Sequence, residues 1–366
     1  MPVGGKSAQH RRMDILETIL TTNGRLSTAD LAKRYGIGQN LLANDLKILE
    51  DLGLVERGHG WVIRRATDVD DLFRGSEYAE RAKRNPKAKA AIADYIVEHC
   101  IVKKLLAHEG TPQLLMDAGS TAYQVARKLI EKGVENIRVI TNNVPVVLYL
   151  SRHSTRISCT LVGGDFYSHW HAANVGDAAA QAIEGKKASL AVLTPRGISL
   201  EVTDTGELGI ALYSEDEHQH AYKRNLAHNG NDLVIALDHS KWVITGELFL
   251  TLIPSAEREI APVRTRGPVR TRGVFASGTE LVEELDKHKR EPSSLHIVTN
   301  QQEGHVCSRD MEATLLAFRA RLEKCFPRGS DTYERIKETV NSIITVVDEA
   351  GNPTTEWQRL WEEPLK

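Results

Sequence analysis

The first 65 residues carry apolar positions at helical spacing, interrupted by short polar turns. The pattern predicts one amphipathic helix over residues 8–22, a short helix over 27–36 and a third over 39–52. Two short strands are expected at 54–55 and 61–63, on either side of the turn sequence RGHG. Three helices with a tight second turn and a β-hairpin predict a winged helix-turn-helix, in which a helix held by a rigid core enters the major groove of DNA.

Beyond residue 87 the pattern changes to short apolar runs that alternate with amphipathic helices. The runs read as strands that end in DAGST, TNN, LVGG and LDHSK, and helices are expected at TAYQVARKLIEKG and at residues 172–185. Strands that alternate with helices predict βαβ units and a mostly parallel sheet. The fold class is therefore α/β.

These changes of pattern divide the chain into four segments. Residues 1–65 form the winged helix-turn-helix, 66–86 a linker with a short helix, and 87–255 an α/β sensor domain. Residues 256–366 form a C-terminal extension that either completes the sensor domain or mediates oligomerisation. Within it, helices are expected at 278–291 and 311–326, strands at 294–300 and from 343, and Trp357 and Trp361 are expected to pack in the chain's own core or against a partner.

Composition and charge are ordinary for a globular protein. The hydrophobic fraction is 41%, the charged fraction 26% and the net charge -2, so DNA binding needs a local basic patch. The first 65 residues hold ten basic and seven acidic side chains, an excess of three positive charges. The four cysteines are scattered and are expected to be free thiols. With no signal-peptide pattern and no apolar run of about 20 residues, we expect a cytoplasmic protein that does not bind membranes.

Three short sequences in the N-terminal segment resemble those of DeoR-family regulators. They are GRLS at 24–27, DLGLVER at 51–57 and the wing RGHG at 57–60. The resemblance implies a double-stranded DNA operator as partner. The residues expected to face it are Ser27, Thr28, Gln39, Asn40, Ala43, Asn44, Lys47, Arg57 and His59.

The predicted recognition helix departs from the family in its charges. The family places two arginines where this chain has Ala43 and Asn44, and a serine where it has Gly38. Arginine supplies phosphate neutralisation and guanine contacts, whereas asparagine pairs with adenine edges. Two interpretations stay open, an operator richer in A·T pairs or weaker DNA binding.

Polar residues at the predicted strand ends indicate a ligand site. In DAGST, Ser120 and Thr121 open a helix whose free backbone N–H groups suit an anion, especially phosphate. The strand ends DAGST, TNN, LVGG and LDHSK, in this order, resemble the DeoR sensor domain, whose fold is of the ribose-5-phosphate isomerase/CoA-transferase-like type. The resemblance to the family covers roughly residues 8–250. It implies a phosphorylated small-molecule effector, such as a sugar phosphate or nucleotide. The implied pocket residues are Asp117, Gly119, Ser120, Thr121, Thr141, Asn142, Gly163, Gly164 and Lys241.

Other residues are interpreted without a role in catalysis. Two histidine pairs are interpreted as solvated loop residues rather than a metal site: His169 with His171, and His218 with His220. The loop of the first pair starts at the predicted pocket, so a ligand contact is open for that pair. Residues 203–224 form an acidic insert relative to the family, which leaves a nucleotide-like effector open. The tandem repeat PVRTRG at 262–273 is interpreted as a flexible surface loop or as a phosphate contact.

The favoured function is a transcription regulator, expected to repress and to form a homo-oligomer, either a dimer or a tetramer. No catalytic residue, metal or cofactor is predicted. Two alternatives stay open. One is an isomerase- or transferase-like enzyme in which Asp117 and Lys241 act as base and cation. The other is a ligand sensor whose winged helix binds protein.

Overall fold

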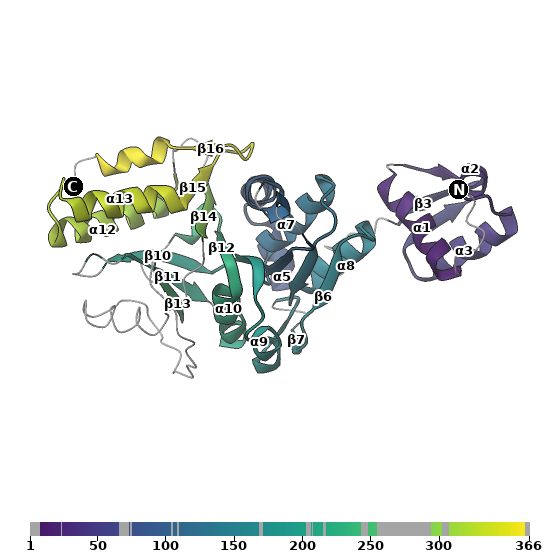
Figure 1. The fold of residues 1–366 in the computed structure, drawn as a ribbon, viewed down its shortest axis with the longest axis horizontal. Helices are drawn as coiled ribbons and strands as arrows, with labels where there is room; N and C mark the ends of the chain where they lie inside the picture. The colour runs from purple at the N-terminus through teal and green to yellow at the C-terminus, as the bar shows by residue number, and fades with distance from the viewer. Residues whose placement is uncertain are drawn as a thin grey trace.

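A computed structural model gives the architecture of the chain (Figure 1). It describes residues 8–22, 24–65, 73, 75–103, 105–107, 110–167, 171–202, 206, 208–214, 217–242, 248–254, 294–301 and 307–362. The PVRTRG repeat, the helix predicted at 278–291 and His169 lie outside the described residues.

The N-terminal unit contains three helices and a small antiparallel sheet in which β3 pairs with both β1 and β2. The elements are α1 (Ala8–Thr21), β1 (Leu26–Ser27), α2 (Thr28–Tyr35), α3 (Gln39–Asp51), β2 (Val55–Gly58) and β3 (Trp61–Arg64). Ser27 caps α2 by accepting a hydrogen bond from the Asp30 N–H at 3.3 Å, and Gly36 ends it at φ 61°. These are the elements predicted for a winged helix-turn-helix.

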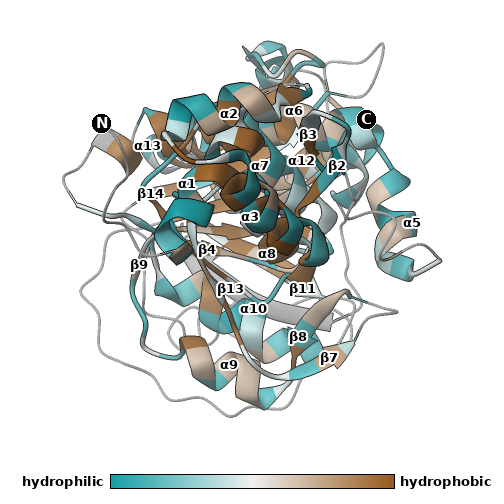
Figure 2. Cartoon of the chain, turned by 90° about the vertical axis from the view of Figure 1, so that its right-hand side faces the viewer, coloured by the Kyte–Doolittle hydropathy of each residue, from teal (hydrophilic) through white to brown (hydrophobic). Residues whose placement is uncertain are grey.

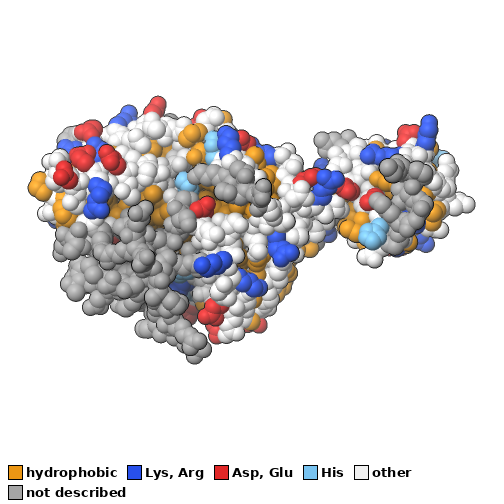
Figure 3. All heavy atoms as spheres, viewed as in Figure 1, with side chains coloured by type: hydrophobic (Ala, Val, Ile, Leu, Met, Phe, Trp, Pro, Cys, Tyr) orange, Lys and Arg blue, Asp and Glu red, His pale blue; other side chains and the backbone are white. Residues whose placement is uncertain are grey.

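This unit has an apolar core of its own, separate from the rest of the chain. Ile15, Leu31, Leu46, Val55 and Val62 pack together in it and are almost fully buried. In Figure 1 the unit lies at one end of the molecule, and Figure 3 shows it joined to the larger part by a narrow neck. An ion pair crosses the neck, from Arg156 Nε to Glu17 Oε1 of α1 at 2.8 Å.

The larger part is built on an eight-stranded sheet with strand order β16-β15-β14-β12-β9-β4-β5-β6. Every neighbouring pair is parallel except β15 and β16. The prediction of a mostly parallel α/β fold is therefore confirmed. The strands are β4 (Gln113–Met116), β5 (Arg138–Thr141), β6 (Ser158–Leu161), β9 (Ala188–Leu193), β12 (Gly230–Ala236), β14 (Ser294–Asn300), β15 (Ile344–Val347) and β16 (Pro353–Thr354).

Helices cover both faces of this sheet, so its strands are apolar on both sides. Leu114 and Met116 point into the core shared with one layer of helices, whereas Leu115 points into the opposite core. Figure 2 shows the central strands as mostly hydrophobic. The first layer is α6 (Pro86–Tyr95), α7 (Ser120–Glu131) and α8 (Val144–His153), and the second includes α9 (Asp177–Ile183), α10 (Glu217–Asn229), α12 (Arg309–Cys325) and α13 (Asp331–Ile343).

Smaller elements complete the larger part. A separate antiparallel sheet has the order β10-β11-β13, and β7 and β8 form a hairpin. Their bounds are β7 (Asp165–Tyr167), β8 (Ala173–Val175), β10 (Gly197–Val202), β11 (Leu208–Ser214) and β13 (Leu248–Pro254). The remaining helices are α5 (Glu77–Lys83), η1 (Ile96–Val102), η2 (Leu105–Ala107), η3 (His239–Lys241) and η4 (Glu356–Trp361).

The C-terminal extension contributes three strands to the main sheet. Strand β14 pairs with β12, and β15 and β16 continue the sheet outward. Trp357 and Trp361 are buried in the chain's own core, and Trp361 makes edge contacts with Phe318 and Tyr333. Of the two roles expected for this segment, completing the sensor domain is the one that the strand order supports.

Two expectations about local structure are wrong. The segment predicted to be helical over 172–185 begins as strand β8, because Gly176 at φ 86° turns the chain and α9 begins only at Asp177. His218 and His220 lie on helix α10, not in a loop. No helix in the described part of the chain is long and apolar enough to cross a membrane.

The extension shares one core with the central strands, which makes its stability testable. Phe318→Ala in α12 removes a fully buried ring and is expected to lower the free energy of unfolding of the larger part by about 3–5 kcal/mol. Phe166→Ala, at a ring that is 51% exposed, is the matched control and should change it by less than about 0.5 kcal/mol. Chemical denaturation measures both. Equal stability of the two variants would show that α12 is not part of that core.

Candidate functional site

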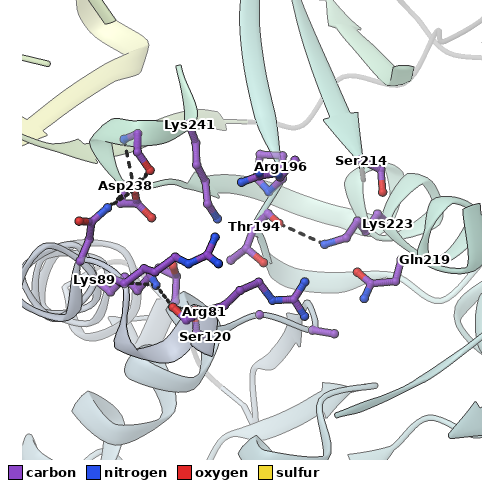
Figure 4. A pocket seen from close by; sticks show the side chains of 17 residues that line it. Arg81, Lys89, Ser120, Thr194, Arg196, Ser214, Gln219, Lys223, Asp238 and Lys241 are labelled. Atoms are coloured by element: carbon purple, nitrogen blue, oxygen red, sulfur yellow. Dashed lines mark hydrogen bonds between the residues drawn. The ribbon is translucent and has the colours of Figure 1, made fainter. Parts of the chain in front are cut away.

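A pocket lies at the carboxyl ends of β4, β9 and β12, where open α/β sheets place ligands (Figure 4). One wall comes from α5, α6 and the start of α7, and the other from the turn after β9 and from α10. Its lining residues are Arg81, Arg84, Asn85, Lys89, Ala118, Gly119, Ser120, Thr121, Thr194, Pro195, Arg196, Ser214, Gln219, Lys223, Asp238, Ser240 and Lys241.

The N-terminus of α7 opens into this pocket. Gly119 is its N-cap and supplies no side chain, so the first N–H groups of the helix have no side-chain acceptor there. A Cβ at Gly119 would lie 2.4 Å from Thr194 Oγ1, so the turn requires glycine. Thr121 Oγ1 is buried and has no hydrogen-bond partner among the described residues. These donor groups suit an anion, because no side chain of the cap accepts their hydrogen bonds.

Asp117 lies beneath the pocket and is fully buried. Its carboxylate accepts hydrogen bonds from Ala118 N–H at 2.7 Å, from Thr194 N–H at 2.9 Å and from Thr194 Oγ1 at 2.8 Å. Lys223 Nζ of α10 is a fourth donor. Asp117 thus joins the ends of β4 and β9 to α10. Because it does not line the pocket, the structure places it as a positioning group, not against a ligand.

Six basic side chains line the pocket, from five different parts of the fold. Arg81 and Arg84 belong to the end of α5, and the other four come from α6, the turn after β9, α10 and η3: Lys89, Arg196, Lys223 and Lys241. Figure 4 shows Arg81, Arg196 and Lys241 extending toward one another across the pocket. Among the described lining residues Asp238 is the one carboxylate.

Lys89 is held in an unusual environment. The residue is 3% exposed, and its amino group donates to the carbonyls of Arg81 and, at 2.5 Å, Arg84. Burial lowers the pKa of Lys89 to about 8, and the neighbouring bases Lys241, Arg81 and Arg84 act in the same direction against the charge of Asp238. The amino group of Lys89 is therefore held by the end of α5 at the edge of the pocket.

Asp238 balances part of this charge at one end. Burial works to raise the pKa of Asp238, but Lys241 and hydrogen bonds from Ser240 and Asn85 outweigh it and hold the pKa below its ordinary value. Asp238 Oδ1 accepts a hydrogen bond from Ser240 Oγ at 2.6 Å and another from Asn85 Nδ2 at 3.0 Å. The carboxylate is therefore ionised and fixed in place.

The predicted ligand residues fall into two groups. Gly119, Ser120, Thr121 and Lys241 line the pocket, whereas five others do not: Asp117, Thr141, Asn142, Gly163 and Gly164. Thr141 Oγ1 accepts from the Asn143 N–H at 3.0 Å, and Asn142 Nδ2 donates to the Asn174 carbonyl at 2.9 Å.

Gly164 has a structural reason to be glycine. It adopts φ 137°, and a Cβ there would lie 2.5 Å from the Val175 carbonyl oxygen. Asn143 connects this region to the pocket, because its amide donates to the carbonyls of Gly119 at 3.2 Å and Asp117 at 3.4 Å. The strand end TNN therefore supports the α7 turn from behind.

The histidines of the two predicted pairs occupy different surroundings. His171 is buried, which corrects the expectation of a solvated residue, and His218 is exposed and stacks on Tyr167 at 5.2 Å between ring centroids. Burial, with a smaller effect of Arg224, lowers the pKa of His220 to about 4. Within the ranges described, no group of three or more His, Cys, Asp or Glu side chains is placed to hold a metal ion.

The predicted DNA-facing residues of α3 lie on one exposed face of that helix. Gln39, Asn40, Ala43, Asn44 and Lys47 are all exposed. Asp45, on another side of the helix, is buried and accepts hydrogen bonds from Arg11 at 2.7 and 3.2 Å, which ties α3 to α1. The face is thus rich in amides and carries one lysine.

Of the remaining four predicted DNA-facing residues, three lie beside this face, and the fourth, Arg57, pairs with a carboxylate of the protein. Ser27 and Thr28 are half-buried at the start of α2, and His59 is exposed at the tip of the wing. Arg57 forms an ion pair with Glu50 at 2.6 Å and donates to the Ala43 carbonyl at 3.2 Å. Its guanidinium therefore fastens the wing to α3.

Sequence reasoning missed most of the pocket's charge. Arg81, Arg84 and Lys89 lie in or beside the segment interpreted as a linker. Lys223 lies in the segment interpreted as an acidic insert, and Arg196 lies shortly before it. The spacing of Arg81 and Arg84, three residues apart before a short helix boundary, is a signal of a basic helix face. Nothing in the local sequence shows that this face meets the strand ends.

The burial of Lys89 makes a prediction about pH. The folded protein holds its pKa near 8, against 10.5 for an ordinary lysine, so between these values the unfolded chain binds more protons. This group therefore makes the free energy of unfolding rise as pH increases from 8 to 10.5, by roughly 3 kcal/mol in all. Denaturant titrations at several pH values should show the rise in the parent relative to Lys89→Met. A constant difference between the two proteins would contradict the burial of this amine.

Comparison with known proteins agrees with this geometry. Residues 84–248 match the model of the DeoR C terminal sensor domain. The chain is similar to the HTH-type transcriptional regulator GlpR of Haloferax volcanii, with 28% identity over 63% of this chain and 80% of that protein. It is also similar to the glycerol-3-phosphate regulon repressor of Haemophilus influenzae, with 25% identity over 61% of this chain and 78% of that protein.

Among solved structures, ribose 5 phosphate isomerase A from Neisseria gonorrhoeae aligns with 42% of this chain and 52% of its own, at 14% identity and a TM-score of 0.27. The sequence relatives and the matched domain carry the assignment. Residues 84–248 therefore resemble a DeoR C-terminal sensor domain, and the relatives that match the chain are transcription regulators and repressors.

Proposed function

We propose that this chain is a DNA-binding repressor whose pocket binds a small phosphorylated effector. The observation that carries the proposal is the start of α7, where uncapped helix N–H groups and the unpartnered hydroxyl of Thr121 open into a pocket lined by six bases. Helix N-termini and basic side chains are the two groups that proteins use most for phosphate. The relatives named as transcription regulators support the same conclusion.

The enzyme alternative is disfavoured by the state of Asp117. A general base must reach the proton of a substrate. Asp117 is fully buried and its carboxylate accepts four hydrogen bonds, including those from Thr194 and Lys223. It is committed to holding strand ends together, so the pocket supports binding better than proton transfer.

The N-terminal unit supplies the DNA contacts in this proposal. Gln39, Asn40 and Asn44 read adenine edges in the major groove, and Lys47 meets a phosphate. Arg57 acts indirectly by holding the wing. The amide-rich face favours an operator rich in A·T pairs.

Regulation requires the effector to change the placement of the winged helices. We propose a cytoplasmic homo-oligomer, a dimer or tetramer, in which ligand binding alters the distance between two heads. Helix α5 contributes Arg81 and Arg84 to the pocket and lies on the path from the N-terminal unit to the sheet. It is the element through which an occupied pocket affects the heads.

DNA binding is tested by substitutions on α3. Asn44→Ala is expected to lower discrimination between operator and mismatched sequence by about 1–3 kcal/mol, because a bidentate base contact is lost. Lys47→Ala is expected to reduce the slope of log K against log salt by about 0.9, the effect of one phosphate. Gel shift and anisotropy with DNA from the chain's own promoter region measure both.

Lys324→Ala, at an exposed lysine of α12, is the matched control and should leave DNA binding unchanged. A parent protein with no salt-sensitive, sequence-preferring DNA binding would sink the repressor proposal and favour a winged helix that binds protein.

Effector binding is tested at the unpartnered hydroxyl. Thr121→Val keeps the shape of the side chain and removes a donor to an anion, so affinity for a phosphorylated ligand is expected to fall roughly ten- to a hundredfold. A thermal-shift screen over sugar phosphates and nucleotides identifies the ligand, and calorimetry measures the loss.

The chain offers a matched control in Thr314 of α12. Its hydroxyl is also buried without a partner among the described residues, but it lies outside the pocket. Thr314→Val is expected to bind ligand as the parent does. Equal weakening in both variants would mean that the α7 hydroxyl has no direct role.

A further inference from the structure

We propose that β6, at one edge of the main sheet, is a dimer interface, where it pairs antiparallel with β6 of a second copy of this chain. This inference rests on the proposed function, because it names the surface that holds the proposed homo-oligomer together. It is drawn from the backbone groups, the side chains and the position of that edge.

The outer side of β6 carries backbone groups that have no partner among the described strands. Strand β6 ends the order of the main sheet and pairs there with β5. The N–H groups of Ser158 and Val162 point inward and donate to carbonyls of the segment 137–141, at 3.1 and 2.8 Å. Because successive residues of a strand point their backbone groups to alternate sides, those of Cys159 and Leu161 point outward.

The two edges of the sheet differ in how they are protected. The opposite edge, β16, is two residues long and begins with Pro353, which has no N–H to donate. Short strands, proline and lysine are the devices by which proteins keep an edge from pairing with another chain. Strand β6 is four residues long, and its sequence SCTL contains neither a charge nor a proline. This edge is therefore open to another strand.

The side chains of β6 are accessible as well. Ser158, Thr160 and Leu161 are exposed, and Leu161 is 42% exposed although leucine is among the residues most often buried. Cys159, which shares a face of the strand with Leu161, is half-buried. In an antiparallel pair the leucine of one copy meets the cysteine of the other on that face, so both side chains are removed from water. A copy of the same uncharged strand is thus a complementary partner.

The available backbone groups favour one register. Pairing centred on Thr160 brings Cys159 of each copy opposite Leu161 of the other, which uses the outward N–H and C=O groups of both residues. Pairing centred on Cys159 would instead bring Leu161 opposite Ile157. The N–H of Ile157 already donates to Ser154 Oγ at 3.2 Å. Pairing centred on Leu161 would leave Cys159 opposite the chain beyond the end of β6.

This interface places the winged helices suitably for a two-fold operator. Figure 1 shows β6 and α8 at the end of the larger part that faces the N-terminal unit. Arg156, just before β6, makes the ion pair to Glu17 of that unit. With the two-fold axis at Thr160, the two Arg156 positions lie about 26 Å apart along the strands. Helix-turn-helix dimers read half-sites about 34 Å apart, so both units lie close enough to one axis for adjacent half-sites.

The interface is tested first by the mass of the full chain in solution, measured by sedimentation velocity at several concentrations. The parent is expected to have at least twice the chain mass of 40.7 kDa. Leu161→Lys places a charge on the edge and is expected to halve the parent mass, with an unchanged circular dichroism spectrum. Leu52→Lys, at a leucine of the N-terminal unit that is 66% exposed, is the matched control and should keep the parent mass.

An engineered disulfide tests the register. In a Cys159→Ser background, Thr160→Cys is expected to give a covalent dimer on mild oxidation. Directly opposed residues of a non-hydrogen-bonded pair have Cα atoms about 4.5 Å apart, which is within the range of disulfides. Ser158→Cys is the matched control, because Ser158 is also exposed and lies on the same face. Its two copies would lie about 13 Å apart and should not crosslink. Non-reducing gel electrophoresis measures both.

The outcomes separate this inference from the proposed function. A parent chain that stays monomeric overturns the proposed homo-oligomer and this interface together. A parent oligomer whose mass survives Leu161→Lys overturns the β6 interface alone and leaves the homo-oligomer with another surface. Absence of the Thr160→Cys crosslink, or equal crosslinking of Ser158→Cys, overturns the register. If Leu161→Lys does not fold, the crosslinking pair decides between these outcomes.

Discussion

The arrangement of the pocket depends on the buried ion pair between Asp117 and Lys223. Its carboxylate fastens the turn after β4 to the end of β9 through Thr194, and its lysine brings α10 to the same point. Removing one partner would leave an uncompensated charge in the core, a change that is strongly destabilising in proteins. The pair therefore fixes the distance between the two walls of the pocket. It also holds the polar residues at the strand ends so that they face the same pocket.

The sequence predicts the elements of this fold better than the contents of its site. Helical spacing located α1 and α3, and apolar runs located the parallel strands, because each pattern reflects burial on a local element. The sequence indicates the turn at 117–121 for a similar reason, since glycine and hydroxyl residues between a strand and a helix are a local signal. The prediction of one long helix at 172–185 is wrong, because Gly176 has a positive φ and interrupts the helix despite the alanines around it.

What the sequence did not reveal is set by contacts between distant segments. Lys89 reads as an ordinary base on a helix, and its burial arises because the end of α5 folds over it. Arg57 reads as a DNA contact, and its partner Glu50 is known only once β2 lies beside α3. The pocket thus combines a turn that the local sequence indicates with basic side chains that only the tertiary structure brings to it.

The position of β14 has a consequence for how the domain can be isolated. The matched family segment ends at residue 248, yet β12 pairs from Asp232 to Ala236 with β14, which begins at Ser294. A fragment cut at the family boundary would present the bare edge of a buried, hydrophobic strand. Such edges recruit other strands and promote aggregation. The unit of folding therefore extends past residue 248, and the strands beyond it cover the edge of β12.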